Sequence, residues 1–211
     1  MKKKNNRYFV LYKPYGVHCR FSEVAGIQDA PTLSGLFAFP KDVYPVGRLD
    51  ADSEGLLLLT NDSGLNHRLL NPQFAHRRTY WVQVEGVPDA AALGQLLEGV
   101  TITVNHKPYH TRPAIAVVLL QQPPNLPPRN LPPRNPPVRY RANIPAPWLQ
   151  LTLTEGKNRQ VRRMCAAVGH PVLRLVRIAI EQLQLGSLQP GQVKEISGNT
   201  VYKTLFNGSP F

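Results

Sequence analysis

The sequence predicts an α/β protein whose sheet is flanked by a few helices. Three observations support this: short aromatic or apolar runs typical of strands, leucines recurring at helical spacing, and turn-forming Pro and Gly residues between these segments. With 211 residues, the chain can bury a substantial core as one large domain or two small ones. We expect one domain over residues 7–197, with a basic disordered tail at 1–6 and a polar tail at 198–211.

Two kinds of pattern predict the strands. Residues 8–12 are aromatic and apolar and end at the turn-forming run Lys-Pro-Tyr-Gly at 13–16, whereas residues 148–154 alternate apolar and polar side chains. In the strand at 79–85, alternation places Tyr80 on the same face as Val82 and Val84. The predicted strands are 8–12, 56–59, 79–85, 100–104, 113–120, 148–154, 172–180 and 193–196.

Most of the predicted helices begin at a polar residue that can cap the first turn. They are 32–39, a helix capped by Asp62 or Ser63, 88–99, and a helix capped by Asn158. In the last helix, Val161, Met164, Cys165 and Val168 recur at i, i+3, i+4 and i+7, which predicts a buried stripe.

The net charge points to a polyanionic partner. The chain has 25 Lys and Arg against 13 Asp and Glu, a formal charge of +12 and a pI near 10.0. Nucleic acid is the usual partner of such a protein. A membrane surface is the weaker alternative, because no basic amphipathic segment stands apart from the core patterns.

The chain has neither the cysteine usage of a secreted domain nor a targeting segment. Cys19 and Cys165 give no disulfide framework, and neither they nor the histidines show the spacing of a zinc site. No apolar run reaches the ~18 residues of a membrane span, and the lysine-rich start lacks the apolar part of a signal peptide. We expect a cytoplasmic monomer without metal.

Residues 121–147 form a Pro-rich insert in this pattern. Four Pro-Pro pairs alternate with arginines, a composition that favours extended polyproline II and contributes little to a core. Two interpretations stay open: a basic arm that lies on RNA, or an ordinary surface loop.

Acidic residues gather in a loop directly before the strand at 56–59. Gly-Arg-Leu-Asp at 47–50 is followed by Asp52 and Glu54, so the loop delivers carboxylates at the end of a core element. Such carboxylates can act on a substrate. Local chemistry alone favours a plainer interpretation, in which the acids cap a helix or pair with arginine at a solvated turn.

A second polar motif, Glu-Gly-Lys-Asn-Arg-Gln-Val-Arg-Arg-Met, occupies residues 155–164. One of its arginines can hold a carboxylate ionised and oriented through a bidentate pair, and the others can bind phosphates. Composition alone favours an exposed basic face. Tyr80, likewise, is by itself typical of a core tyrosine whose hydroxyl reaches the edge.

These two motifs and the Lys-Pro turn at 13–14 resemble, in family order, the RsuA group of pseudouridine synthases, over roughly residues 8–196. The resemblance implies a large mixed, mostly antiparallel sheet with flanking helices and a central basic cleft. It implies isomerisation of uridine to pseudouridine in ribosomal RNA, without a cofactor. It also implies that Asp50 is the catalytic residue, that Arg162 pairs with it and that Tyr80 lies against the target base.

The resemblance also suggests which cations contact RNA. Lys13, Arg159 and Arg163 are expected to hold phosphates. The full predicted set of RNA-binding residues is Lys13, Arg48, Arg77, Arg78, Lys157, Arg159 and Arg163. Two further runs, at 134–139 and 144–148, resemble members that act on large-subunit rRNA, and no small RNA-binding domain is expected before the Lys-Pro turn.

Other functions stay open on the residues alone. A non-catalytic ribosome-assembly factor would use the same basic surface, and its binding would follow arginine charge and salt concentration. A glycosidase could pair Asp50 with Asp52 or Glu54, although +12 is an unusual charge for an enzyme of neutral sugars. Within the synthase hypothesis, Asp50 could attack the base or the ribose, or act as a base on the ribose.

Overall fold

The computed structural model describes residues 5–121, 128, 131–139, 141 and 143–207. The chain divides into two units, Met1–His76 with Arg177–Phe211 (unit 1) and Arg77–Val176 (unit 2), and each is described by itself below. The predictions for residues 1–4 of the basic tail, for 208–211 and for much of the Pro-rich insert fall outside the described residues.

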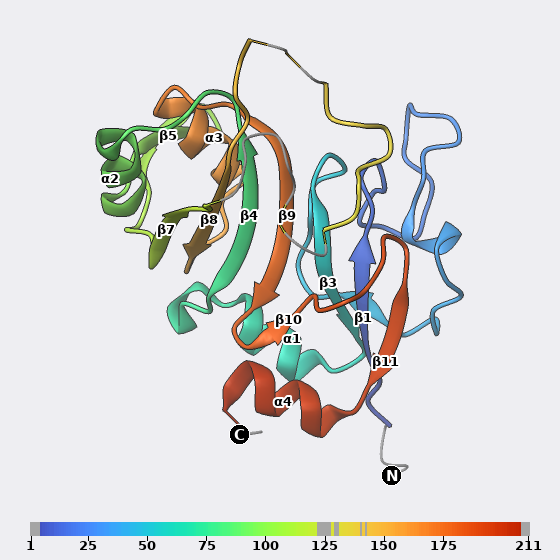
Figure 1. Cartoon of the computed structure of the whole chain (residues 1–211). Helices are drawn as coiled ribbons and strands as arrows, with labels where there is room; N and C mark the ends of the chain where they lie inside the picture. Colours follow the sequence, from blue (N-terminus) through green and yellow to red (C-terminus); the bar gives the residue numbers. More distant parts are fainter. Residues whose placement is uncertain (1–4, 122–127, 129–130, 140, 142, 208–211) are drawn as a thin grey trace. The chain divides into compact units, whose positions relative to one another are not determined.

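Unit 1 is built on a buried antiparallel sheet. Strand β1 (Tyr8–Lys13) lies between β11 (Val193–Ile196) and β3 (Glu54–Thr60), as Figure 1 shows. All residues of β1 and β3 are buried, because these apolar strands are covered on both faces. The short strand β2 (Tyr44–Pro45) pairs with β3, and β10 (Leu183–Gln184) pairs with the end of β9 (Val172–Ile180).

Aromatic residues and leucines cover one face of this sheet. Phe9, Leu11 and Leu57 pack there with Leu33 from the single 3-10 turn η1 (Leu33–Gly35). The predicted helix at 32–39 is therefore wrong beyond this turn. The chain leaves the helical path because the rings of residues 37 and 39 pack on Phe9, at centroid distances of 6.0 and 5.6 Å.

Two helices of unit 1 meet at Asp62. This residue caps α1 (Ser63–Leu70), as predicted, by accepting a hydrogen bond from the Leu65 N–H at 3.1 Å. Its Oδ2 also accepts from the hydroxyls of Tyr8 and Tyr202, each at 2.8 Å. Partial burial by itself would raise the pKa of Asp62, but these hydrogen bonds hold that pKa below its ordinary value.

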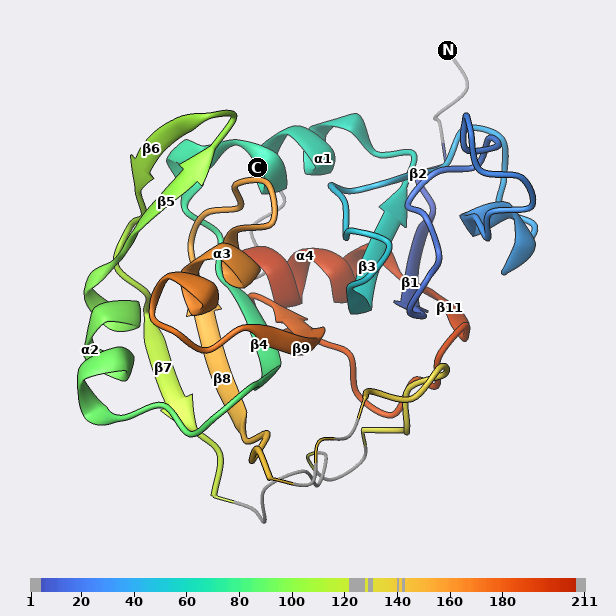
Figure 2. The same cartoon turned by 90° about the horizontal axis from the view of Figure 1, so that it is seen from above.

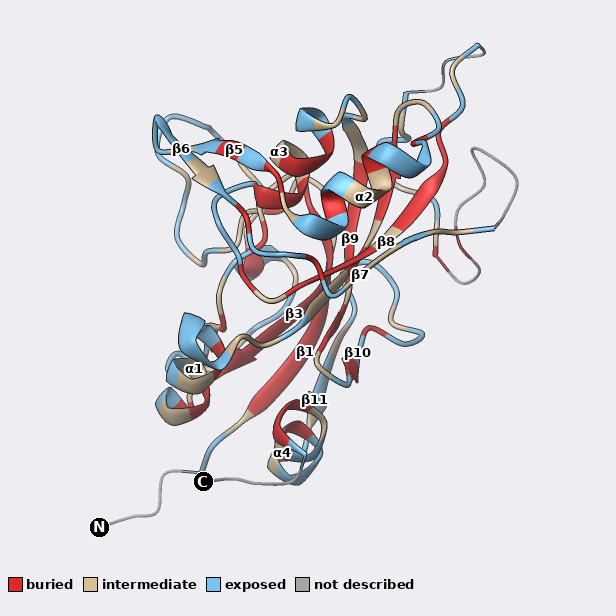
Figure 3. Ribbon diagram, turned by 90° about the vertical axis from the view of Figure 1, so that its left-hand side faces the viewer, coloured by how far each residue is buried: buried red, intermediate tan, exposed pale blue. Residues whose placement is uncertain are grey.

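Helix α4 (Gly198–Phe206) corrects the predicted polar tail at 198–211. Its side chains at 201, 205 and 206 are buried, because their spacing of about one helical turn forms an apolar stripe (Figure 3). Ser197 caps the helix through the Thr200 N–H at 3.2 Å. The prediction failed because three apolar residues among polar ones gave too weak a periodic signal in so short a segment.

Unit 2 contains a second set of antiparallel strands with helices beside them (Figure 2). Strand β8 pairs with β4 on one side and β7 on the other, while β5 and β6 form a separate hairpin. The first residues of β9, Val172–Val176, belong to this unit. The element bounds are β4 (Arg78–Val84), α2 (Ala90–Glu98), β5 (Thr101–Val104), β6 (Lys107–His110), β7 (Ala116–Leu119), β8 (Trp148–Leu153) and α3 (Gln160–Ala167).

The two faces of the β4–β8 pair differ in chemistry. Tyr80, Val82 and Val84 face a core that also contains Met164 and Cys165 of α3. The opposite face carries polar cross-strand pairs: Thr79 with Thr152 at 3.0 Å between hydroxyls, and the Trp81 indole N–H with Gln150 at 3.3 Å. Alternation therefore assigned Tyr80 to the correct face.

Every predicted strand has a counterpart in the structure, and the ladders that β1 and β8 form with their neighbours are antiparallel. The expected fold class is confirmed, while the central basic cleft and the single domain stay predictions. The strands β2, β6 and β10 were not predicted. They are two to four residues long, too short for an alternating pattern to be distinguished from a turn.

We expect Asp62→Ala to lower the free energy of unfolding by about 2–4 kcal/mol, because it removes a helix cap and leaves two tyrosine hydroxyls without their acceptor. The contribution of a carboxyl with a lowered pKa is complete above its ordinary value, 3.8, and is lost as pH falls through its folded value. Urea unfolding of both proteins at neutral pH and near pH 3 measures this.

Asp89→Ala is the matched control, because exposed Asp89 caps α2 through the Ala92 N–H at 2.7 Å. It should cost only about 1 kcal/mol. Equal losses in the two variants would show that the tyrosine contacts contribute nothing.

Candidate catalytic site

Asp50 lies on the loop between β2 and β3 of unit 1 and is half-buried. Backbone hydrogen bonds hold this loop at both ends. The Val46 N–H donates to the Leu58 carbonyl at 2.8 Å, and the Ser53 N–H donates to the Asp50 carbonyl at 3.0 Å. The peptide after Asp50 is fixed as well, because the Ala51 carbonyl accepts from the backbone of residue 16 at 2.7 Å. The carboxylate is thus carried on an ordered backbone.

Lys13 anchors the same loop from the end of β1. Its ammonium donates to the carbonyls of Pro14 at 2.9 Å, Val17 at 2.7 Å and Ala51 at 3.3 Å, and the side chain is completely buried. The predicted phosphate contact of Lys13 is therefore wrong, because the ammonium faces backbone carbonyls and not solvent. The Lys-Pro turn holds the Asp50 loop in place.

Burial lowers the pKa of Lys13 to about 8. The nearby carboxylates of Glu54, Asp52 and Asp50 act in the opposite direction, because they favour the ammonium form. Lys13 is thus the positive charge buried beneath the acidic loop.

Cys19 supports the residue before Asp50. Its Sγ accepts a hydrogen bond from the Leu49 N–H at 3.3 Å, and burial raises the pKa of its thiol. A neutral thiol next to the backbone is a structural contact, and no spacing in the sequence could have indicated it. Cys165, predicted on the core stripe of α3, is fully buried, and burial raises its pKa to about 12.

The glycine of the Ser-Glu-Gly-Leu run has a steric role. Gly55 adopts φ +104°, and a Cβ there would collide with the backbone of Arg177 in β9. The Arg177 guanidinium is buried and its Nε donates to the Leu56 carbonyl at 2.8 Å. This contact fixes the strand that follows the Asp50 loop.

Tyr80 and Arg162 belong to unit 2, on neighbouring elements. Tyr80 lies in the middle of β4, opposite Leu151 of β8, and only 9% of its surface is exposed. Helix α3 packs on this face of the sheet through its buried stripe and carries Arg162, whose Nη1 donates to the Val172 carbonyl at 3.3 Å. Asp50 belongs to unit 1, so its convergence with these two residues stays a prediction.

A buried carboxylate organises the motif at 155–164. Glu155 accepts from the Tyr109 hydroxyl at 2.6 Å, the Arg112 N–H at 2.8 Å and the Gln160 amide at 2.7 Å. The side-chain oxygen of Gln160 accepts in turn from the Lys157 N–H at 2.8 Å. The sequence did not indicate Glu155 and Gln160, because two of the three donors to Glu155 lie more than 40 residues away.

The start of α3 differs from the prediction. The helix begins at Gln160, and the preceding Arg159 adopts a left-handed φ of +52°. Asn158 does not cap the helix, because its carbonyl and side-chain oxygens accept from the Arg163 guanidinium at 2.7 and 2.9 Å. These two hydrogen bonds hold the Arg163 guanidinium in one orientation.

The remaining predicted RNA-binding residues lie at the surface. Arg48, Arg77, Lys157 and Arg159 are exposed. The Lys157 ammonium lies 4.7 Å from the centroid of the Tyr109 ring. Arg78 and Arg163 are partly exposed. Contact of all six with RNA stays a prediction.

Among the residues that the structure describes, no group of three or more His, Cys, Asp or Glu side chains is placed to hold a metal ion. No helix in the described ranges has the length and apolar character needed to cross a bilayer.

Comparison with known proteins decides the family. Residues 7–167 match the model of the RNA pseudouridylate synthases, three quarters of the chain. The chain belongs to this family. The match includes both units in part, and it contains Lys13, Asp50, Tyr80 and Arg162.

Individual relatives extend the likeness over most of the chain. Ribosomal large subunit pseudouridine synthase E of Xanthomonas campestris pv. campestris is 51% identical over 185 residues, which cover 87% of this chain and 91% of the relative. The synthase E of Vibrio parahaemolyticus is 45% identical, with 92% and 75% covered. Ribosomal large subunit pseudouridine synthase B of Bacillus subtilis is 34% identical, with 92% and 69% covered.

A solved structure supports the fold. The crystal structure of a pseudouridylate synthase aligns with a TM-score of 0.73 at 27% identity, over 97% of this chain and 76% of the other. The RsuA-group resemblance of the sequence motifs is thereby confirmed, and the relatives at 45–51% identity are E-type synthases.

We expect the contribution of Lys13 to the free energy of unfolding, measured as the difference between wild type and Lys13→Met, to rise between about pH 8 and about pH 10.5. In this range the unfolded chain keeps a proton on Lys13 that the folded chain has released, because the folded pKa, about 8, lies below the ordinary 10.5. Lys13→Met should be less stable, because three carbonyls lose their donor, and should lack this contribution. Urea unfolding at several pH values measures the difference.

Lys203→Met is the control, because Lys203 is exposed on α4 and its removal should leave the pH profile unchanged. Parallel profiles for wild type and Lys13→Met would contradict the assignment.

Proposed function

We propose that this pseudouridine synthase isomerises one uridine of large-subunit ribosomal RNA to pseudouridine, with Asp50 as the catalytic residue. The observation that carries the proposal is the 51% identity to a large subunit pseudouridine synthase E over 87% of the chain. The ordered loop around Asp50 supports it, because a catalytic group must keep its direction when the substrate arrives.

The reaction breaks the bond between the ribose and N1 of uracil and forms a carbon–carbon bond from the same ribose carbon to the same base. The base must rotate between these two steps, but no atom is gained or lost, and the proposal includes no cofactor. A uridine in folded RNA must first leave its stack, which costs a few kcal/mol. The synthase has to recover this cost from contacts with the extruded nucleotide.

Asp50 would act as a carboxylate, on the base or on the ribose, or as a base towards the ribose. Arg162 would pair with it across the two units, keeping it ionised and oriented. Tyr80 would stack against the uracil, since a base–aromatic contact contributes roughly 1–3 kcal/mol. Only 9% of the Tyr80 surface is exposed, so the uracil would contact a small part of this residue.

The RNA backbone would be held by the surface cations. The proposed set is Arg48, Arg77, Arg78, Lys157, Arg159 and Arg163. The contact of Arg163 with Asn158 presents it in one direction, and this lowers the entropy cost of phosphate binding. Lys13 would have a positioning role, through Ala51, in place of a phosphate contact. We further propose a cytoplasmic monomer as the working form.

We expect Asp50→Asn to lower pseudouridine formation by roughly 10³-fold or more, while RNA affinity changes little. The amide has almost the shape of the carboxylate but neither its charge nor its nucleophilicity. Pseudouridine mapping in rRNA from cells that lack the gene and carry each variant gives the activity. Filter binding with the same rRNA gives the affinity.

Asp52→Asn is the matched control, since Asp52 is half-buried on the same loop and has the same charge. It should keep most of the activity. An Asp50→Asn protein that still forms pseudouridine would refute the assignment. Loss of activity in Asp52→Asn alone would favour a different acid, and RNA binding without pseudouridine formation by the wild type would favour a non-catalytic RNA-binding factor.

A further inference from the structure

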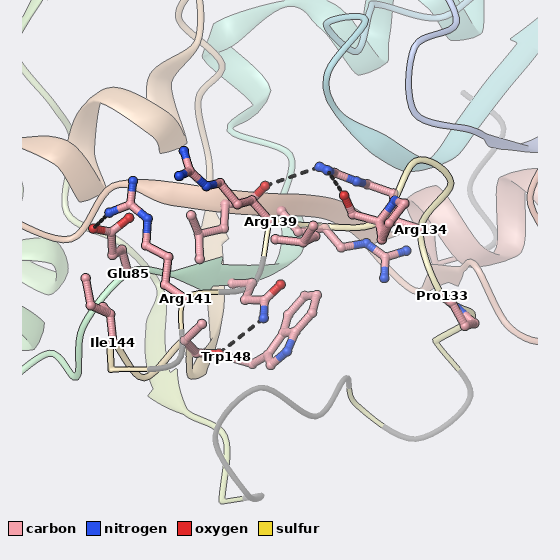
Figure 4. A pocket seen from close by; sticks show the side chains of 13 residues that line it. Glu85, Pro133, Arg134, Arg139, Arg141, Ile144 and Trp148 are labelled. Carbon is pink, nitrogen blue, oxygen red and sulfur yellow. Dashed lines mark hydrogen bonds and ion pairs between the residues drawn. The ribbon is translucent and has the colours of Figure 1, made fainter.

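A cavity of about 250 Å³ lies in unit 2, between the sheet and the described part of the Pro-rich insert (Figure 4). Gln83 of β4, Trp148 of β8 and Arg174 of β9 form its sheet side, and Arg134, Arg139 and Arg141 come from the insert. None of the residues predicted to be catalytic or RNA-binding lines it.

The cavity lies on the opposite face of the β4–β8 pair from Tyr80. Gln83 is paired with Trp148 across the two strands, and alternation turns both side chains away from the core that contains Tyr80 and α3. The sheet of unit 2 therefore lies between the cavity and the predicted catalytic residues of this unit. The proposed active site does not account for the cavity.

The lining combines positive charge with an apolar wall. Among the described residues, four arginines and one glutamate line the cavity, and Glu85 is bound to the Arg141 guanidinium at 2.7 Å. Most of the other lining residues are apolar, from the insert and from β9. The site thus suits a ligand with both an anionic group and an apolar face.

The charged wall is preformed. The Arg134 guanidinium donates to the carbonyls of Pro136 at 2.8 Å and Pro137 at 3.0 Å, which folds the insert around its own arginine. The Arg174 guanidinium carbon lies 5.9 Å from the centroid of the Trp148 ring, and Arg174 is buried. A wall that is already ordered costs little further entropy when a ligand binds.

Trp148 supplies a second, independent sign of a ligand. Its indole Nε1 is buried and has no hydrogen-bond partner in the described part of the chain, although the side chain is only 1% exposed. Buried donors of this kind are rare, because each costs free energy. A ligand acceptor that reached this nitrogen from the cavity would satisfy it.

We propose that this cavity binds one unpaired nucleotide of the RNA substrate, at a site separate from that of Asp50. The proposal rests on the proposed function in that the partner is RNA. Single-stranded RNA is recognised by stacking of unpaired bases on aromatic rings and guanidinium planes, with arginines on the phosphates. The volume lies below that of a drug-sized pocket, so it suits one base and not an oligonucleotide.

This assignment decides between the two interpretations of the Pro-rich insert. The described residues 131–139 act as one wall of an RNA-binding cavity and not as an ordinary surface loop. A second point of contact would let the synthase select its uridine by a base at a fixed distance from it. The modified uridine itself carries too little sequence information for that.

The first test uses Trp148 as its own reporter. The chain has two tryptophans, so Trp81→Phe leaves Trp148 as the only one. Tetrauridylate and tetraadenylate should quench its fluorescence in a saturable way. Inorganic phosphate, an acidic peptide such as tetraglutamate, and duplex RNA at equal concentrations should not. Quenching by phosphate or tetraglutamate as strong as that by single-stranded RNA would overturn the proposal, as would the absence of quenching by any of them.

The second test measures pseudouridine formation on a large-subunit rRNA substrate with two cavity variants. Arg139→Glu reverses an exposed charge of the wall, and Val138→Phe fills the cavity without changing charge. Each should raise KM by roughly 5- to 100-fold, the range expected from losing one base contact, with kcat unchanged.

Lys107→Glu is the matched control, an exposed cation on β6 of the same unit that does not line the cavity. It should change KM by less than about twofold at moderate salt. An equal effect of Lys107→Glu and Arg139→Glu would mean general electrostatics and overturn the proposal, as would unchanged KM in both cavity variants. If the wild type forms no pseudouridine, the proposed function fails, and the fluorescence test still decides the cavity.

Discussion

The buried ammonium of Lys13 is the contact on which the proposed catalytic loop depends. It links the end of β1 to the peptide after Asp50 by donating to the Ala51 carbonyl, while two carbonyls of its own turn take its other hydrogens. Burying a charge is costly unless hydrogen bonds satisfy it, so the chain retains this arrangement only as a complete set. The result is an acidic loop whose backbone is held in one position.

The rest of the Asp50 loop follows the same principle, in which buried polar groups fix backbone near a functional side chain. Cys19 holds the N–H before Asp50, and Arg177 holds the strand after it. In unit 2, Glu155 gathers three donors and sets the start of α3, which carries Arg162. In both units, a charged or polar group inside the protein fixes the backbone near a predicted catalytic residue. The few proposed catalytic residues thus depend on a larger number of residues that fix the backbone around them.

The proposed nucleotide site lies on the face of the β4–β8 pair that does not pack on α3. One face of these strands is closed by α3 and the core, and the other carries polar pairs that end at Gln83 and Trp148. The insert closes over this end with arginines. A family fold that performs one reaction can thus acquire its own substrate preference from a loop of low complexity, without change to the strands.

The sequence by itself determined most of the strands, the capped helix α1, the side of β4 on which Tyr80 lies, and the family, because alternation, caps and local motifs are read over a few adjacent residues. It misjudged Lys13, Asn158 and the segment of α4, and it could not indicate Glu155 or Arg177. Glu155 and Arg177 depend on partners tens of residues away, as with Arg177 and Leu56, 121 residues apart. Only tertiary structure decides whether a lysine after a strand meets solvent or three carbonyls, since burial and distant backbone set the energy of a charge.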